Sequence, residues 1–166
     1  MTAYGDDNIQ TVNIDNALPD QPILALGSNV SDGATSTEAT QDSGVVTVKA
    51  EAGSKIKVTF SNGNNNVVKE ILSTGVVQGV KLLSSEVATL LGGTTPSAAT
   101  VSVSAIATDA AGNDSTAGTS SFSLDTAAPK LSSTTPTIDK SIILGTGGDS
   151  LGETIKLTLR DRKSVV

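Results

Sequence analysis

The sequence predicts an all-β fold in which two sheets pack face to face, and three observations lead to this prediction. Apolar and polar residues alternate with a period of two, most clearly over residues 55–60 and 101–107. Such alternation is typical of strands that bury one face. Turn-forming sequences such as Asn62-Gly63 separate the alternating segments. About seven short strands in roughly 110 residues are typical of an immunoglobulin-like sandwich.

The strands follow one another along the chain between these turns. In the third, Ile56, Val58 and Phe60 face one way, and in the sixth only Ile106 interrupts the alternation. In the last, Phe122 and Leu124 occupy the buried face. We expect strands at residues 22–26, 44–50, 55–60, 67–72, 76–83, 100–108 and 119–124.

One segment has a helical pattern instead. Residues 84–91 carry serines at the front and are followed by Gly92, which predicts a short helix with a serine cap and a glycine stop. With aromatic residues at 2% of the chain, the core must be built from Val, Ile, Leu and Ala. Such a core is modest, and an external stabiliser would strengthen it.

Composition excludes several classes of function. The 166 residues include 17 acidic and 11 basic ones, for a net charge of −6, and no His, Cys or Trp. A Ser-His-Asp triad, a thiol nucleophile, an ordinary zinc site and disulfides are therefore impossible, and we expect no enzyme. Few aromatics and negative charge argue against nucleic acid as a partner. Hard cations such as Ca²⁺ suit this oxygen-rich chain best.

Two octapeptides indicate an internal repeat. Residues 12–19 (VNIDNALP) and 122–129 (FSLDTAAP) share one pattern at an offset of 110 residues. Residues 53–60 and 152–159 match again, in the same order. A tandem array explains both matches. We therefore predict a leader or end of a preceding repeat at 1–15, a complete domain at 16–125, and the start of a second immunoglobulin-like unit at 126–166.

The chain also resembles a known family. Residues 107–115 (ATDAAGNDS), followed by 124–129 (LDTAAP), are similar to the bacterial Ig-like repeats of giant RTX-type and biofilm-associated surface adhesins. Residues 80–90 resemble the segment that precedes this motif. The resemblance covers about 16–129 and departs from the family in the polar turn 62–66 and in the unfinished last unit. It implies tandem sandwiches forming a stalk, stiffened by calcium near the linkers.

Topology and resemblance together predict a calcium site. In such a sandwich, the loops after the second and sixth strands lie at the end where the first strand begins. This places Glu51, Asp109 and Asn113 near Asp15, where clustered carboxylates would repel one another without a cation. Ca²⁺ accepts six to eight oxygen ligands of mixed type. Hydrated carboxylates without a metal are the alternative.

The opposite end holds a second group of acids. Asp125 corresponds to Asp15 in the repeat, so it is predicted to bind calcium there or in the next unit, together with Asp149 and Glu153. For Asp149, as for Asp32 and Asp42, simple solvation is the favoured alternative.

The resemblance implies a calcium-stiffened extender in a cell-surface adhesin that acts in adhesion or biofilm formation. Its partners would be neighbouring Ig-like repeats of the same chain, with a host, ice, cell or biofilm surface contacted through other domains. Export to the bacterial surface by type I secretion is expected, without membrane insertion, because no apolar run approaches the length of a span. A ligand-binding adhesin module and an S-layer-like lattice component are the alternatives.

Overall fold

The computed structural model describes residues 14–128. The chain divides into two units, Met1–Thr126 and Ala127–Val166. The predicted second Ig-like unit, with Asp149 and Glu153, therefore lies outside the described residues, apart from its first three positions.

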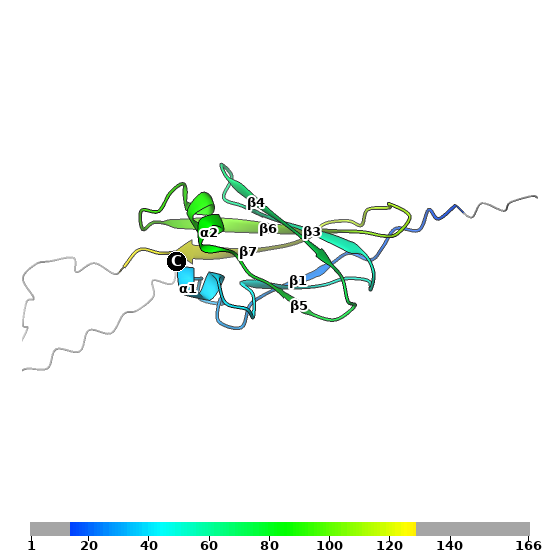
Figure 1. Cartoon of the computed structure of the whole chain (residues 1–166), viewed down its shortest axis with the longest axis horizontal. Coiled ribbons are helices and arrows are strands. Elements are labelled where there is room, and N and C mark those ends of the chain that lie inside the picture. Colours follow the sequence, from blue (N-terminus) through cyan, green and yellow to red (C-terminus); the bar gives the residue numbers. More distant parts are fainter. Residues whose placement is uncertain (1–13, 129–166) are drawn as a thin grey trace, which may run out of the picture. The chain divides into compact units, whose positions relative to one another are not determined.

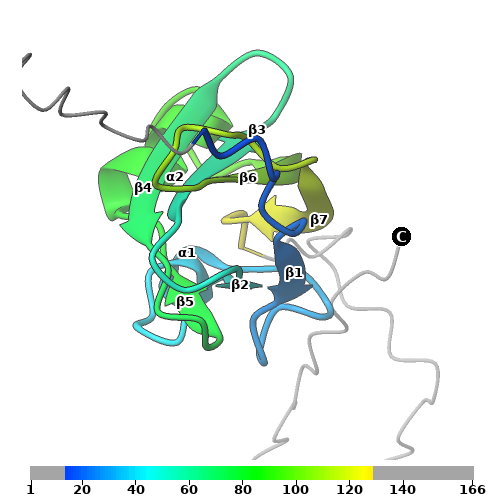
Figure 2. The ribbon, with the colours of Figure 1, turned by 90° about the vertical axis from the view of Figure 1, so that its right-hand side faces the viewer.

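The described part of the first unit is a two-layer antiparallel β-sandwich, which confirms the predicted fold class (Figures 1 and 2). One sheet has the strand order β1-β2-β5 and the other the order β4-β3-β6-β7. Seven strands are present within residues 14–128: β1 (Ile23–Leu26), β2 (Val46–Lys49), β3 (Lys55–Ser61), β4 (Asn66–Leu72), β5 (Gln78–Val80), β6 (Ala98–Thr108) and β7 (Gly118–Asp125). Each of these strands either contains one of the predicted strands or lies within it.

The fifth strand is shorter than predicted. It ends at Val80 because the chain then leaves the sheet: the Leu82 amide donates a hydrogen bond to the Ala39 carbonyl, 2.9 Å away, instead of to a neighbouring strand. The side chain of Leu82 is nevertheless fully buried. Burial in the core therefore explains the apolar pattern that continues beyond the strand.

Small aliphatic side chains from both sheets fill the space between the layers. The two phenylalanines, Phe60 of β3 and Phe122 of β7, meet edge to face with ring centroids 6.4 Å apart. Such pairs contribute about 0.5–1.5 kcal/mol beyond their buried area. Around this pair, the fully buried side chains are mainly aliphatic: Ile56, Leu82, Leu90, Leu124, Val45, Val46, Val48, Val58, Val101 and Val103.

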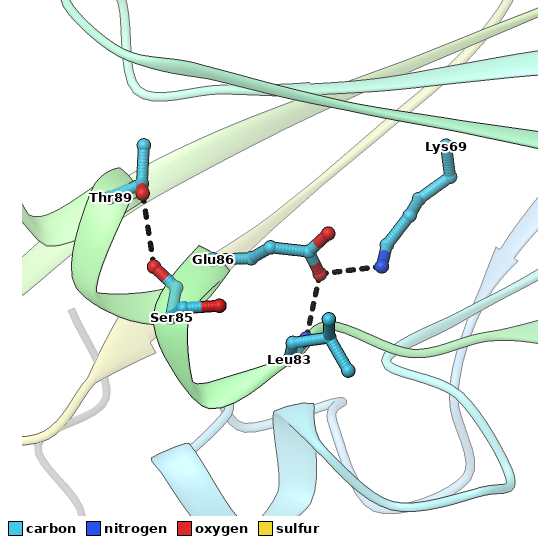
Figure 3. A network of polar contacts seen from close by, with 5 residues as sticks. All are labelled: Lys69, Leu83, Ser85, Glu86 and Thr89. Atoms are coloured by element: carbon cyan, nitrogen blue, oxygen red, sulfur yellow. Dashed lines mark hydrogen bonds and ion pairs between the residues drawn. The ribbon is translucent and has the colours of Figure 1, made fainter.

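Helix α2 (Ser84–Leu91) closes one end of the sandwich and confirms the predicted helix, including its stop at Gly92, which has a φ of +75°. The predicted serine cap is wrong. Leu83 occupies the N-cap position, and the Glu86 carboxylate accepts a hydrogen bond from its backbone N–H at 2.7 Å (Figure 3). The same carboxylate oxygen lies 2.5 Å from Lys69 Nζ of β4, so one acidic group caps the helix and ties it to a strand.

A second helix, α1 (Ser36–Ala39), was not predicted. Thr35 Oγ1 accepts a hydrogen bond from the Glu38 N–H, and the Glu38 carboxylate accepts one from the Thr35 N–H. This reciprocal pair satisfies amides that the first helical turn leaves unpaired. The helix is a single turn within the loop that joins β1 to β2.

The antiparallel registers define two ends of the sandwich. Lys55 pairs with Leu72 of β4 and with Thr108 of β6, and Ile23 pairs with Lys49. The start of β1, the β2–β3 loop and the β6–β7 loop therefore lie at one end, here called the linker pole. The other end, here called the far pole, holds α1, α2 and the last residue of β7, Asp125.

Replacing Leu90 tests whether α2 is an integral part of the core. Leu90 is fully buried, so Leu90→Ala should lower the free energy of unfolding by about 2–5 kcal/mol in urea denaturation. Leu83→Ala is the control, since Leu83 is 53% exposed and its loss should cost less than about 0.5 kcal/mol. Equal effects of the two substitutions would contradict the packing described above.

Candidate metal centre

An acidic pocket of about 250 Å³ lies at the linker pole. Three segments line it: the incoming segment (residues 14–22), the β2–β3 loop and the β6–β7 loop. Each segment contributes one carboxylate, namely Asp15, Glu51 and Asp109. The other lining residues are small or apolar, so the acids supply its formal charge.

Two prolines and a close backbone approach hold the incoming segment against the domain. Pro19 and Pro22 are buried although their neighbours are exposed. The Pro22 carbonyl passes so close to Gly118 that a Cβ there would lie 2.1 Å from its oxygen. Gln21 Nε2 also donates a hydrogen bond to the Ala117 carbonyl at 2.6 Å. The segment therefore runs along the end of the β6–β7 loop before it becomes β1.

The β2–β3 loop is fixed by buried serines. Ser54 Oγ donates to the Glu51 carbonyl at 2.7 Å, and Ser73 Oγ donates to the Ala50 carbonyl at 2.9 Å. These bonds set the backbone of Glu51 at the rim of the pocket. Its carboxylate is exposed and makes no hydrogen bond or ion pair with residues 14–128. It is the most available oxygen donor of the three acids.

Asp109 organises the β6–β7 loop. Its Oδ1 accepts hydrogen bonds from the Ala111 N–H at 2.9 Å and the Asn113 N–H at 2.8 Å, and its Oδ2 accepts one from Asn113 Nδ2 at 2.9 Å. The Asn113 side-chain bond, followed by its backbone bond, lowers the pKa of the Asp109 carboxyl below its ordinary value. Gly112, with a φ of +94°, provides the left-handed turn that the loop requires.

Asn113 reaches from this loop to the incoming segment. Its Nδ2 lies 3.1 Å from the Asp15 carbonyl oxygen and 3.1 Å from the Ala17 carbonyl oxygen. On the other side, Asp15 Oδ1 accepts a hydrogen bond from the Ala17 N–H at 2.9 Å. The segment and the loop are thus joined by side-chain amide to backbone contacts.

The structure brings Asp15, Glu51 and Asp109 to one pocket, with Asn113 beside them. Asp125 lies at the far pole, paired with Ala98 in the sheet. Asp149 and Glu153 lie outside the described residues. Metal binding by any of these residues stays a prediction.

Asp32 and Asp42, for which the sequence favours simple solvation, also lie at or near the far pole. The Asp42 carboxylate lies 2.5 Å from Lys81 Nζ, and this pairing lowers the pKa of Asp42 through a hydrogen bond and charge attraction. Asp32 lies in the turn between β1 and α1.

Among residues 14–128, the pocket acids have no basic partner. The ion pairs between described residues, Lys69–Glu86 and Lys81–Asp42, lie elsewhere. Within residues 14–128, no group of three or more acidic side chains is already arranged to hold a metal ion. Binding a cation would therefore require the exposed carboxylates to turn toward one another, which exposed side chains do on the nanosecond timescale.

The sequence gives no sign of the residues that support the pocket. The side chains concerned donate hydrogen bonds to backbone carbonyls, which every residue carries, so no sequence spacing identifies Ser54, Ser73 and Gln21. Comparisons with protein-family models, with curated proteins and with solved structures find no match for this chain. In the part of the chain that the structure describes, no helix is long and apolar enough to cross a membrane.

The lowered pKa of Asp109 predicts a pH-dependent contribution to stability. A carboxyl whose pKa is lower in the folded state stabilises the fold above its unfolded-state pKa, near 4, and loses this effect as the pH falls through the folded-state pKa. Asp109→Asn should therefore melt below the wild type at pH 7, and the difference should shrink below about pH 3.

The measurement is thermal unfolding followed by circular dichroism between pH 2 and pH 7 (roughly the range over which carboxyls titrate). Asp20→Asn serves as the matched control, because Asp20 is exposed and makes none of these contacts. A difference between Asp109→Asn and wild type that stays constant with pH would show that the carboxylate charge plays no part.

Proposed function

We propose that this domain is a calcium-stiffened extender module of a bacterial cell-surface adhesin. The observation that carries the proposal is the acidic pocket, in which Asp15, Glu51 and Asp109 come from the incoming segment and two separate loops. A cation held there would bind the segment and the domain at once. The pocket is thus suited to fixing the direction in which the chain enters the sandwich.

The donors suit calcium chemically. All three are carboxylates, no His or Cys exists in the chain, and the pocket lies open at the surface of the linker pole. Ca²⁺ takes carboxylate, carbonyl and water oxygens together in flexible geometries, whereas Mg²⁺ demands near-ideal octahedral geometry and gives up its waters reluctantly. A pocket that offers carboxylate oxygens from three separate segments and has room for water fits the larger ion better.

Linkage makes such a site a stiffening device. An ion that binds only the docked arrangement stabilises it by about 1.4 kcal/mol at ten times the dissociation constant. Extracellular modules bind calcium with dissociation constants of about 10⁻⁴–10⁻³ M. The docked arrangement of the incoming segment would therefore be less stable where calcium is scarce and more stable outside the cell.

The repeat and the family resemblance support the wider role. Residues 12–19 and 122–129 match at the two ends of the domain, so the same kind of junction would recur along a tandem array. The partners are then neighbouring Ig-like repeats of the same chain, and export from the bacterial cell places the array in a calcium-rich medium. Contact with a target surface would fall to other domains.

Calcium removal tests the proposal directly. The full chain in millimolar calcium should melt about 5 °C higher than in EDTA, as expected for about 1.4 kcal/mol in a domain of this size. Glu51→Gln should abolish most of this difference, because it removes the pocket carboxylate that makes no hydrogen bond or ion pair with residues 14–128.

Glu70→Gln is the matched control, since Glu70 is exposed on β4 outside the pocket and should leave the calcium effect intact. Analytical ultracentrifugation under the same two conditions measures the hydrodynamic length. If calcium changes neither the melting temperature nor the sedimentation coefficient, the proposal is refuted.

A further inference from the structure

Asn113 presents the nitrogen of its side-chain amide, and not the oxygen, to the incoming segment. Three oxygens surround Nδ2: the Asp15 carbonyl at 3.1 Å, the Ala17 carbonyl at 3.1 Å and Asp109 Oδ2 at 2.9 Å. An amide NH₂ group has two hydrogens to donate and no lone pair that could bind a cation. In this arrangement Asn113 acts as a donor to backbone carbonyls.

Three hydrogen bonds to Asp109 hold Asn113 in place within the loop. Its backbone N–H donates to Asp109 Oδ1 at 2.8 Å, its backbone carbonyl accepts from the Asp109 N–H at 3.1 Å, and its side chain donates to Asp109 Oδ2. One acidic residue therefore orients both the backbone and the amide of Asn113. The donor group is positioned by contacts within the loop, whether or not the segment is docked.

The incoming segment presents matching acceptors. The bond from the Ala17 N–H to Asp15 Oδ1 closes a tight turn, and the carbonyls on either side of Asn16 both lie within reach of one amide. Residues 14–18 are exposed, so apolar burial contributes little to holding them. Upstream of buried Pro19, hydrogen bonds to Asn113 are the main attachment of the segment to the domain.

We propose that Asn113 is a latch that docks the incoming segment on the β6–β7 loop without any metal, and is not the cation ligand that the sequence suggested. The latch deepens the proposed function, because it brings Asp15 to the acidic pocket. Docking itself does not depend on that function, since every contact above is made by the protein alone.

The latch has a consequence for cation affinity. If only a fraction of molecules has the segment docked, the apparent dissociation constant of an ion that needs Asp15 is the intrinsic constant divided by that fraction. A pre-docked segment keeps this fraction near one. Removing the latch should therefore weaken calcium binding several-fold even though no ligand is lost.

Backbone dynamics of the full chain in EDTA provide the test. In the wild type, the ¹⁵N order parameters of Asn16 and Ala17 should be near those of a rigid backbone, about 0.85, and in Asn113→Ala they should fall below about 0.6. Asn113→Asp should fall equally, because a carboxylate of the same shape cannot donate to the two carbonyls. The order parameters of β6 and β7 should not change in either variant.

Two matched variants separate the latch from a general effect on the loop. Gln21→Ala removes the other hydrogen bond of the segment, to the Ala117 carbonyl, but lies beyond buried Pro19 and should leave Asn16 and Ala17 rigid. Asp114→Asn alters the next residue of the same loop, whose carboxylate accepts from Thr108 and does not touch the segment. It too should leave the segment docked.

Each outcome of these measurements either supports or overturns the latch. Flexible residues 15–17 in wild type, or unchanged order parameters in Asn113→Ala, would overturn the latch. So would an Asn113→Asp variant that stays rigid in EDTA and binds calcium at least as tightly as wild type, because a ligand role predicts that result. A wild type that is docked in EDTA but shows no calcium effect would instead remove the proposed function and leave the latch standing.

Discussion

Strand β3 sets the geometry on which the remainder of the domain depends. It pairs over its full length with β4 on one side and with β6 on the other, so that Lys55 lies opposite Leu72 and Thr108, and Ser61 lies opposite Asn66 and Ser102. A shift of either partner by one residue would turn the buried faces toward water. Because Ile56, Val58 and Phe60 are fully buried, such a shift is strongly disfavoured.

This register also determines what meets at the linker pole. The β2–β3 loop precedes Lys55 and the β6–β7 loop follows Thr108, and these two residues are paired neighbours. Glu51 and Asp109 are thereby brought to one end by the hydrogen-bonded sheet, while the incoming segment reaches it through β1. The pocket is therefore a consequence of sheet pairing. The backbone hydrogen bonds of the sheet bring the loops that carry its acids to the same end of the domain.

The core explains why a domain of this kind would benefit from a bound ion. Its two aromatic side chains form a single contact, and the rest of the interior consists of aliphatic residues, including buried alanines such as Ala39, Ala105 and Ala107. Each small side chain removes less apolar surface from water than a larger one would. Since native domains are stable by only about 5–15 kcal/mol, a contribution of 1–2 kcal/mol per site is a substantial fraction.

Local sequence patterns were sufficient for most elements, and the misses have physical causes. Alternation located the strands because a half-buried strand requires it. The single turn α1 is too short to show a helical period, although Thr35 and Glu38 have the spacing of a capping box. At α2, the serines suggested a side-chain cap, but Glu86 satisfies the Leu83 amide from inside the helix and pairs with Lys69 on a strand.

The sequence by itself determined the all-β class, the positions of the strands and the loops that carry Asp15, Glu51 and Asp109, because period and turn chemistry are local properties. Only the tertiary structure decided which atoms meet. Asn113 and Asp15 are separated by 98 positions, and whether an amide offers its oxygen or its nitrogen depends on the acceptors around it. Likewise Asp42 is paired because folding places Lys81 beside it. Contacts between distant segments depend on the packing of the whole domain, and no local pattern encodes them.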